Sequence, residues 1–333
     1  MQTLSEQTGI QSDSSRLKTT VRIVADAEVP SAHKQDWFYT PTGEPRGYIQ
    51  PRLLKELWFH TGTICNLQCP FCLEGSKPGD TRLASLRLED AVPFMDEALT
   101  MGVEQFSFTG GEPFVIKDIV EILNYALDHR PCLVLTNGTD PLLRRFKQIL
   151  PLRDKPHELS FRISLDFPDQ ERHDAGRGKG NFHKSLKTLT NLFQSGFHVS
   201  VARQSSRGEN PREIHAAYQH LFIEAGLPTD VPIVAFPDFL TPSSFAEVPP
   251  ISENCIRTYK KEESSRARFM CYSSKMVLKK QEKMKVYACT LVDDDPDYDL
   301  GETLTEAMKI RVMLKHHRCY SCFAYGASCS QLD

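Results

Sequence analysis

Three cysteines lie close together in the stretch "HTGTICNLQCPFCLEG", residues 60–75. Cys65, Cys69 and Cys72 do not pair off into disulfides, and they are one ligand short of a structural zinc site. A [4Fe–4S] cube has four irons, so three thiolates would leave one iron open to another ligand. The spacing therefore indicates an iron–sulfur site with an open iron. A zinc site with a distant fourth ligand, or thiols without a ligand role, are the alternatives.

A second group of cysteines lies near the other end of the chain and consists of Cys271, Cys289, Cys319, Cys322 and Cys329. Four thiolates drawn from separated pairs suit either zinc or a fully ligated [4Fe–4S] cluster. Cys132 lies in the apolar run "CLVLT" and is expected in a buried strand, whereas Cys255 is assigned no role.

Composition excludes several other classes of protein. The 333 residues carry a net charge of −3, which argues against a nucleic-acid partner. No run of about 18 apolar residues predicts a membrane span. The N-terminus lacks the apolar core of a signal peptide, so we expect a cytoplasmic chain. Ten cysteines in such a chain indicate metal or redox chemistry rather than disulfides.

The elements that must position the first cysteines form a repeated strand–helix pattern. Helical spacing of apolar residues follows the strands, for example over 88–99, 119–126 and 186–193, and "NPRE" at 210–213 predicts a helix start. The predicted strands are 56–60, 105–109, 132–136, 159–165, 198–203 and 231–236. Six such units predict an α/β fold, a partial (β/α)6 TIM-like barrel, with the cysteine loop at its carboxyl rim.

The chain divides into three predicted parts. Residues 1–53 form an N-terminal extension that packs on the main domain, 54–240 form the barrel, and 241–333 form a linker and a small cysteine-rich domain. In the last part we expect a hairpin over 274–289 and a helix over 303–314, with Thr303 and Glu306 spaced as a capping box. This part has few large apolar residues, so metal crosslinks would have to stabilise it.

Two motifs resemble those of a known family. "CNLQCPFC", residues 65–72, resembles the C-x3-C-x2-C signature of the radical S-adenosylmethionine (SAM) superfamily, and "FTGGEP", residues 108–113, resembles its GGE motif. The resemblance covers residues 54–240 as the core and 255–333 as an appendage.

The resemblance implies a specific reaction. The open iron of the cluster held by Cys65, Cys69 and Cys72 would chelate the amino nitrogen and carboxylate of SAM. The reduced cluster would cleave a carbon–sulfur bond to give a 5′-deoxyadenosyl radical, which abstracts hydrogen from a small-molecule or peptide substrate. The protein would supply binding, orientation and exclusion of water.

The resemblance also implies which residues bind SAM. Phe71 would lie beside the adenine, Gly110 and Gly111 would allow close backbone approach, and Glu112, followed by Pro113, would accept from the ammonium. Ser164 would lie near the ribose or carboxylate. Arg177, with Arg203 as a second candidate, would pair with the carboxylate.

Other polar residues are expected near the same rim. Asp166 and Asn137 are candidates for substrate contact, although Asn137 is favoured as a simple turn residue. His60 and His173 are expected to be structural.

The C-terminal cysteines resemble the shortened auxiliary-cluster domain called twitch, which is related to the longer SPASM domain. The resemblance implies one auxiliary [4Fe–4S] cluster on Cys271, Cys289, Cys319 and Cys322, with Cys329 as a replacement ligand or a spare thiol. The stretch "KMKVYAC" lacks the glycine of the usual SPASM pattern, so the subtype stays open. Such a cluster would exchange electrons with a substrate radical, or serve structure alone.

The sequence also bears on the partners of the protein and on alternative functions. Residues 257–285 hold ten Lys or Arg against three Glu, which predicts either a solvated face or a docking surface for a flavodoxin- or ferredoxin-type electron donor. The short N-terminal part favours a small molecule or a free-standing peptide as substrate. The alternative functions are transfer of a 3-amino-3-carboxypropyl group from SAM and a non-catalytic iron–sulfur or zinc protein.

Overall fold

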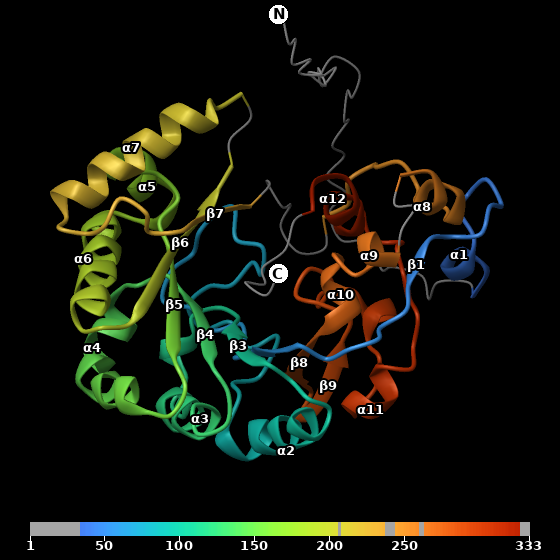
Figure 1. The fold of residues 1–333 in the computed structure, drawn as a ribbon, viewed down its shortest axis with the longest axis horizontal. Helices are drawn as coiled ribbons and strands as arrows, with labels where there is room; N and C mark the ends of the chain where they lie inside the picture. Colours follow the sequence, from blue (N-terminus) through green and yellow to red (C-terminus); the bar gives the residue numbers. More distant parts are fainter. Residues whose placement is uncertain (1–33, 206–207, 237–243, 260–262, 327–333) are drawn as a thin grey trace, which may run out of the picture.

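The protein is built on one eight-stranded sheet with the order β7-β6-β5-β4-β3-β2-β8-β9 (Figure 1). A computed structural model describes residues 34–205, 208–236, 244–259 and 263–326. Neighbouring strands from β2 to β7 are parallel. Their bounds are β2 Glu56–His60, β3 Gln105–Thr109, β4 Cys132–Thr136, β5 Leu159–Ser164, β6 His198–Gln204 and β7 Ile233–Phe236. Each predicted strand is confirmed to within two residues at either end.

Helices cover the outer face of the curved sheet, as a partial barrel requires (Figure 1). They are α2 Leu88–Thr100, α3 Ile119–Ala126, α4 Asp140–Ile149, α6 Asn181–Gln194 and α7 Pro211–Glu224. The short helix α5 Gln170–Arg177 packs against α6. The 3-10 turns η1 Pro113–Val115 and η2 Leu150–Asp154 lie between them. The predicted start of α7 is confirmed, because the Asn210 side chain accepts from the Arg212 amide and Pro211 takes the first helical position.

The C-terminal part contributes the other two strands of the same sheet. The predicted hairpin is confirmed as β8 Ser274–Lys280 and β9 Lys283–Tyr287, with Gln281 and Glu282 both at positive φ in its tight turn. β8 runs parallel to β2, with Ser274 opposite Glu56. The hairpin therefore extends the barrel sheet along the free edge of β2.

The rest of the C-terminal part is made of short elements. They are α8 Glu253–Tyr259, α9 Glu263–Arg266, α10 Met270–Ser273, η3 Pro296–Tyr298, α11 Leu304–Ala307, β10 Val312–Met313 and α12 His317–Tyr325. The helix predicted over 303–314 is wrong in length. Its cap is real, since the Thr303 side chain accepts from the Glu306 amide, but β10 ends the segment as a strand.

The described part of the N-terminal extension packs on the C-terminal part. It contains α1 Lys34–Phe38 and β1 Tyr48–Ile49, and β1 pairs antiparallel with β10. The Gly47 amide donates to Ile251 O and the Arg52 amide to Tyr272 O. Among the described helices, none is both long and apolar enough to cross a lipid bilayer.

Candidate functional site

A cavity of about 210 Å³ lies at the carboxyl ends of the parallel strands. The loop after β2 brings to its wall Cys65, Cys69, Phe71 and Cys72. The ends of the later strands and the segments that follow them add to this wall Gly110, Gly111, Ser164, Arg177 and Arg203. The structure thus gathers nine predicted site residues around one space. Glu112 and Pro113 are buried but do not line it.

The cysteine loop is held by its own backbone. The Cys65 amide donates to Lys77 O at 3.3 Å, and the Cys72 amide donates to Cys69 O at 3.1 Å. The Leu67 amide points at Cys65 Sγ at 3.4 Å. These hydrogen bonds turn the loop tightly, so that the three thiols of residues 65–72 face one cavity.

The thiols are poor anions without a metal. Burial raises the pKa of Cys65 to about 12, and Glu112 and the other two thiols raise it too. Burial also raises the pKa of Cys69 and of Cys72. Three thiolates in this position therefore need a cationic centre to stabilise them.

The spread of the sulfurs distinguishes between metal centres. Among the described residues, the three thiol sulfurs do not all come within 4.8 Å of one another. One zinc with Zn–S bonds of about 2.3 Å would draw its sulfurs to within about 4 Å. The donor set therefore fits an iron–sulfur cube better than a single zinc ion.

Gly110 and Gly111 are required by the cysteine loop itself. The Gly111 amide donates to Gly62 O at 2.8 Å and the Glu112 amide donates to Ile64 O at 3.1 Å. A Cβ at Gly111 would lie 2.3 Å from Ile64 O, and one at Gly110 would lie 2.8 Å from Gly62 O. The close approach predicted for these glycines is therefore an approach to the protein's own backbone, which locks the two motifs together.

The Glu112 carboxylate ties the same region to β4. It is 1% exposed and accepts from Thr136 Oγ1 at 2.7 Å, from the Asn137 amide at 2.8 Å and from the Phe114 amide at 3.1 Å. Burial raises its pKa, and these donors oppose the rise. In this arrangement the carboxylate serves the protein's own groups.

Asn137 is more than a turn residue. Its Nδ2 donates to Asn66 Oδ1 at 3.0 Å, and its Oδ1 accepts from the Thr139 amide at 3.0 Å. The Nδ2 group also lies 3.9 Å from Cys65 Sγ. Asn137 thus links the end of β4 to the cysteine loop.

Phe71 is placed by a glycine that the sequence analysis did not single out. A Cβ at Gly176, in α5, would lie 2.3 Å from Phe71 Cε1. The Arg177 guanidinium lies over the same ring, with Cζ 5.6 Å from its centroid. The ring is therefore fixed between α5 and the cavity.

Both predicted arginines already have carboxylate partners. Arg177 forms a two-pronged ion pair with Asp166, and Arg203 forms another with Glu209. Asp166 raises the pKa of Arg177 against the effect of burial, so this guanidinium stays charged. Asp166 lines the cavity but is committed to Arg177.

The comparisons decide the family. Residues 59–221 match the family described as the radical SAM superfamily. This part of the chain belongs to the radical SAM superfamily. The match contains both cysteine loop and GGE segment, and it identifies the cavity as that of a radical SAM domain.

Named relatives match over part of their length. The antilisterial bacteriocin subtilosin biosynthesis protein AlbA of Bacillus subtilis is 36% identical over 153 residues, covering 45% of this chain and 33% of AlbA. The mycofactocin maturase MftC of Mycolicibacterium smegmatis is 34% identical over 147 residues, covering 42% of this chain and 36% of MftC. The matched region spans about a third of the length of each relative.

A solved structure confirms the fold beyond the matched region. Streptococcus suis SuiB bound to S-adenosylmethionine superposes with a TM-score of 0.58 at 14% identity, covering 84% of this chain and 69% of SuiB. SuiB bound to its precursor peptide SuiA gives a TM-score of 0.56 at 13% identity, with coverage of 84% and 68%. At this identity the likeness shows the fold alone: a partial barrel of the radical SAM type.

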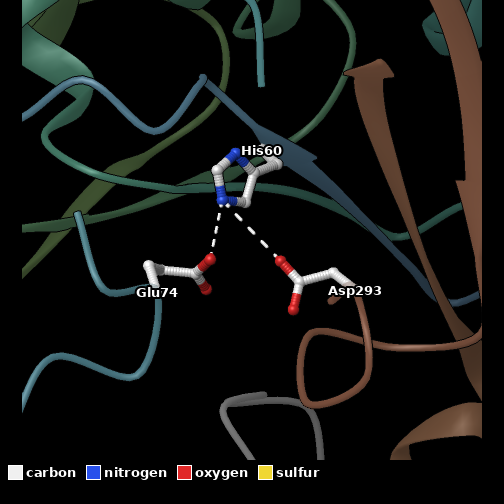
Figure 2. A group of neighbouring side chains, drawn as sticks. All are labelled: His60, Glu74 and Asp293. Carbon is white, nitrogen blue, oxygen red and sulfur yellow. Dashed lines mark hydrogen bonds and ion pairs between the residues drawn. The ribbon is translucent and has the colours of Figure 1, made fainter. Parts of the chain in front are cut away.

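His60, at the end of β2, meets two carboxyl groups at the border between the radical SAM domain and the C-terminal part (Figure 2). Its Nε2 lies 3.0 Å from Glu74 Oε2 and 3.7 Å from Asp293 Oδ2. Burial raises the pKa of Glu74, but the interactions with His60, together with a hydrogen bond from Asp293, outweigh it, so the pKa lies below its ordinary value. Burial, and then Glu74, raise the pKa of Asp293 well above its ordinary value.

This group has the spacing of a metal site, since its three ligand atoms lie within 4.8 Å of one another. The His60 tautomer argues against that function. The Gly62 amide donates to His60 Nδ1 at 3.1 Å, so the ring proton sits on Nε2 and points at the carboxyl groups. A metal on Nε2 would have to displace that proton. The group is therefore a proton-linked junction between β2, the cysteine loop and the C-terminal part.

The C-terminal cysteines converge from three segments. Cys271 lies on α10, Cys289 follows β9, and Cys319 and Cys322 lie one helical turn apart on α12. Burial raises the pKa of Cys271, and Cys322 and Cys319 raise it as well, while the same two thiols also act on Cys289. Cys329 lies outside the described residues. Cys132 is buried in β4 as predicted.

Sequence reasoning missed several residues around these sites. Asp293 was not singled out, and Lys275 and Lys279 were noted only as members of the basic stretch 257–285. All three are buried, at 7%, 0% and 7% exposed. For the two lysines a signal was available, since the consecutive apolar residues Met276–Leu278 indicate a strand covered on both faces, and Lys275 and Lys279 share a face with Val277.

Proposed function

We propose that this chain cleaves S-adenosylmethionine reductively and uses the resulting radical to abstract hydrogen from a peptide substrate. The observation that carries the proposal is one cavity lined at once by three spread thiols, the paired glycines of the GGE segment and Phe71. Membership of residues 59–221 in the radical SAM superfamily supports it.

Cys65, Cys69 and Cys72 would hold the SAM-binding [4Fe–4S] cluster. When bound, the cluster and SAM supply the electron and the carbon–sulfur bond whose cleavage starts the reaction. The chain's own contribution is a rigid loop. The bonds from Gly111 and Glu112 to Gly62 and Ile64 fix the loop against the sheet.

SAM would occupy the cavity beside that cluster. Phe71 offers a ring face for the adenine, and Ser164 a hydroxyl for the ribose or carboxylate. Arg203 and Arg177, each in an ion pair with a carboxylate, line the same cavity. Glu112, which precedes Pro113, holds the GGE segment against β4 through its hydrogen bonds. Its contact with the SAM ammonium stays a prediction.

A peptide is the substrate class that the relatives favour. AlbA is named for biosynthesis of a bacteriocin, MftC is named a maturase, and SuiB has been seen with a precursor peptide. The sequence alone is also compatible with a small-molecule substrate. Leu67, Leu73 and Phe236 give the cavity an apolar wall. Two carboxylates also line it, Glu74 and Asp166, of which Asp166 is paired with Arg177.

We also propose an auxiliary [4Fe–4S] cluster on Cys271, Cys289, Cys319 and Cys322. Four mutually interacting thiols support it, and those of Cys271, Cys289 and Cys319 are buried. Residues 54–240 would then form the SAM-binding unit and 241–333 the auxiliary unit, sharing one sheet. The auxiliary cluster would accept the electron that a substrate radical loses on net oxidation.

An external electron donor of the flavodoxin or ferredoxin type would reduce the SAM-binding cluster. The basic stretch 257–285 is a candidate docking surface only in part, because Lys275 and Lys279 are buried. The exposed cations that support it include Arg257 and Arg268.

Product analysis tests the proposal. The anaerobically reconstituted chain, given dithionite and SAM, is expected to release 5′-deoxyadenosine, and replacing Cys65, Cys69 and Cys72 by Ala should abolish it. Methylthioadenosine above the background decay of SAM would instead indicate aminocarboxypropyl transfer. Absence of both products from protein carrying its full iron, with peptide candidates present, would favour a non-catalytic protein.

A further inference from the structure

Lys275 is a buried cation without a carboxylate partner. Its side chain is 0% exposed. Its Nζ donates to Cys271 O and to Ser274 O, both at 2.9 Å, and it forms no ion pair with a carboxylate among the described residues. Lysine is almost never fully buried unless its charge is paired, because desolvation of an ammonium is costly. The structure therefore calls for an anion near this side chain.

The hydrogen bond from Lys275 Nζ to Cys271 O ties this side chain to the backbone of one of the auxiliary cysteines. The charged groups that act on Lys275 are Cys271 and Cys289, two of the four cysteines that converge there. A [4Fe–4S] cluster with four thiolates carries a net charge of −2 when oxidised and −3 after accepting one electron. Such a cluster would be the missing anion.

Lys279 shows how the same strand deals with a buried lysine elsewhere. It is 7% exposed, and its Nζ meets Asp90 Oδ2 at 3.0 Å and Oδ1 at 3.1 Å. Both lysines lie in β8, four residues apart. Lys279 has a carboxylate partner, whereas Lys275 has the cysteine site. Lys279 is therefore a matched control for the loss of a buried lysine charge from β8.

The two carbonyl contacts of Lys275 do not explain its charge. Cys271 O and Ser274 O need hydrogen-bond donors, and a neutral amide side chain would supply them. A positive charge beside a centre that becomes more negative on reduction stabilises the reduced form. Net charge and nearby donors are among the features that set cluster potentials.

We propose that Lys275 is the buried counter-charge of the auxiliary cluster and raises its reduction potential. The inference rests on the proposed auxiliary cluster. Reduction adds one electron to the cluster and leaves the ammonium unchanged. Lys275 is a positioning residue that acts through the cluster and does not touch the substrate.

The test uses the full chain with Cys65, Cys69 and Cys72 changed to Ala, so that only the C-terminal centre can hold iron. Iron per chain and the potential at which the reduced-cluster EPR signal appears are measured anaerobically. Lys275→Gln is expected to keep its iron and to shift the potential to more negative values. A tenfold change in the reduction equilibrium, 59 mV for one electron, is the expected minimum. Lys275→Arg and Lys279→Met should stay near the parent.

The outcomes separate the inference from the proposed function. Full iron and an unchanged potential in Lys275→Gln would overturn the inference and leave the auxiliary cluster in place. A parent that binds zinc or no metal at these cysteines would overturn the auxiliary cluster and, with it, the role of Lys275. If Lys275→Gln loses iron while Lys275→Arg retains it, the charge is required and the inference stands. Loss of iron in both would show a packing role and overturn it.

Discussion

A single methyl group at Gly111 tests how the GGE segment and the cysteine loop hold each other. In Gly111→Ala the new Cβ would lie 2.3 Å from Ile64 O and 2.8 Å from Thr63 O, and both are backbone atoms that cannot swing away. Overpacking of this kind costs about 1–3 kcal/mol. Moving the segments apart would also weaken the bonds from Gly111 to Gly62 and from Glu112 to Ile64, at about 0.5–1.5 kcal/mol each.

The expected loss of stability is therefore about 2–6 kcal/mol, measured by urea denaturation of the metal-free chain. The loop should also lose its iron while the C-terminal cysteines keep theirs. Gly102→Ala is the control, since nothing lies within 4 Å of its Cβ and only its positive φ is strained. It should cost about 1 kcal/mol. A Gly111→Ala chain with the parent's denaturation midpoint and iron content would refute the reasoning.

Three other changes test different parts of the site. Gly176→Ala should push the Phe71 ring into the cavity and weaken SAM binding, measured by titration calorimetry. It should destabilise the fold less than Gly111→Ala, because a side-chain ring can move. Unchanged SAM affinity would contradict this expectation. Asp293→Ala removes one of the two hydrogen-bond donors of Glu74 and leaves His60 as the other, so it should cost about 1–3 kcal/mol in urea. Asp293→Asn keeps a donor at this position and should cost less. Burial lowers the pKa of His173 to about 4, so the unfolded chain binds its proton first as pH falls below about 6.5. The free energy of unfolding of the metal-free chain should fall as the pH is lowered from 6.5 to 4. In His173→Gln this fall should be smaller by up to about 2–3 kcal/mol. An equal fall in both chains would contradict the expectation.

The first four strands of the barrel, β2 to β5, were predictable because most of their residues are buried. Glu56–His60 is buried along its whole length, and such strands read as short apolar runs. The start of α7 was equally clear, since Asn210 and Pro211 form a local capping signal that needs no tertiary information. The three cysteines and the GGE segment also followed from local sequence.

The roles of single charged residues were not predictable in this way. Lys275 stands in a run of basic residues, and its burial follows only from the pairing of β8 with β2, which joins positions more than 200 residues apart. Asp293 reaches His60 for the same reason. The segment after Thr303 has a helical pattern, but pairing of β10 with β1 overrides it beyond Ala307. Tertiary pairing decided each case.

The register of the hairpin also explains how the two cysteine groups relate to the cavity. Cys65 follows the carboxyl end of β2, whereas Cys271 precedes Ser274, which is opposite the amino end of β2. The two groups therefore lie toward opposite ends of β2, which is itself about 16 Å long at about 3.3 Å per residue. The chain after Cys289 then runs back along this distance, since Thr290 lines the cavity and Asp293 reaches His60 at the far end. The cavity that the cysteine loop lines therefore also has Thr290, the direct neighbour of Cys289, in its wall.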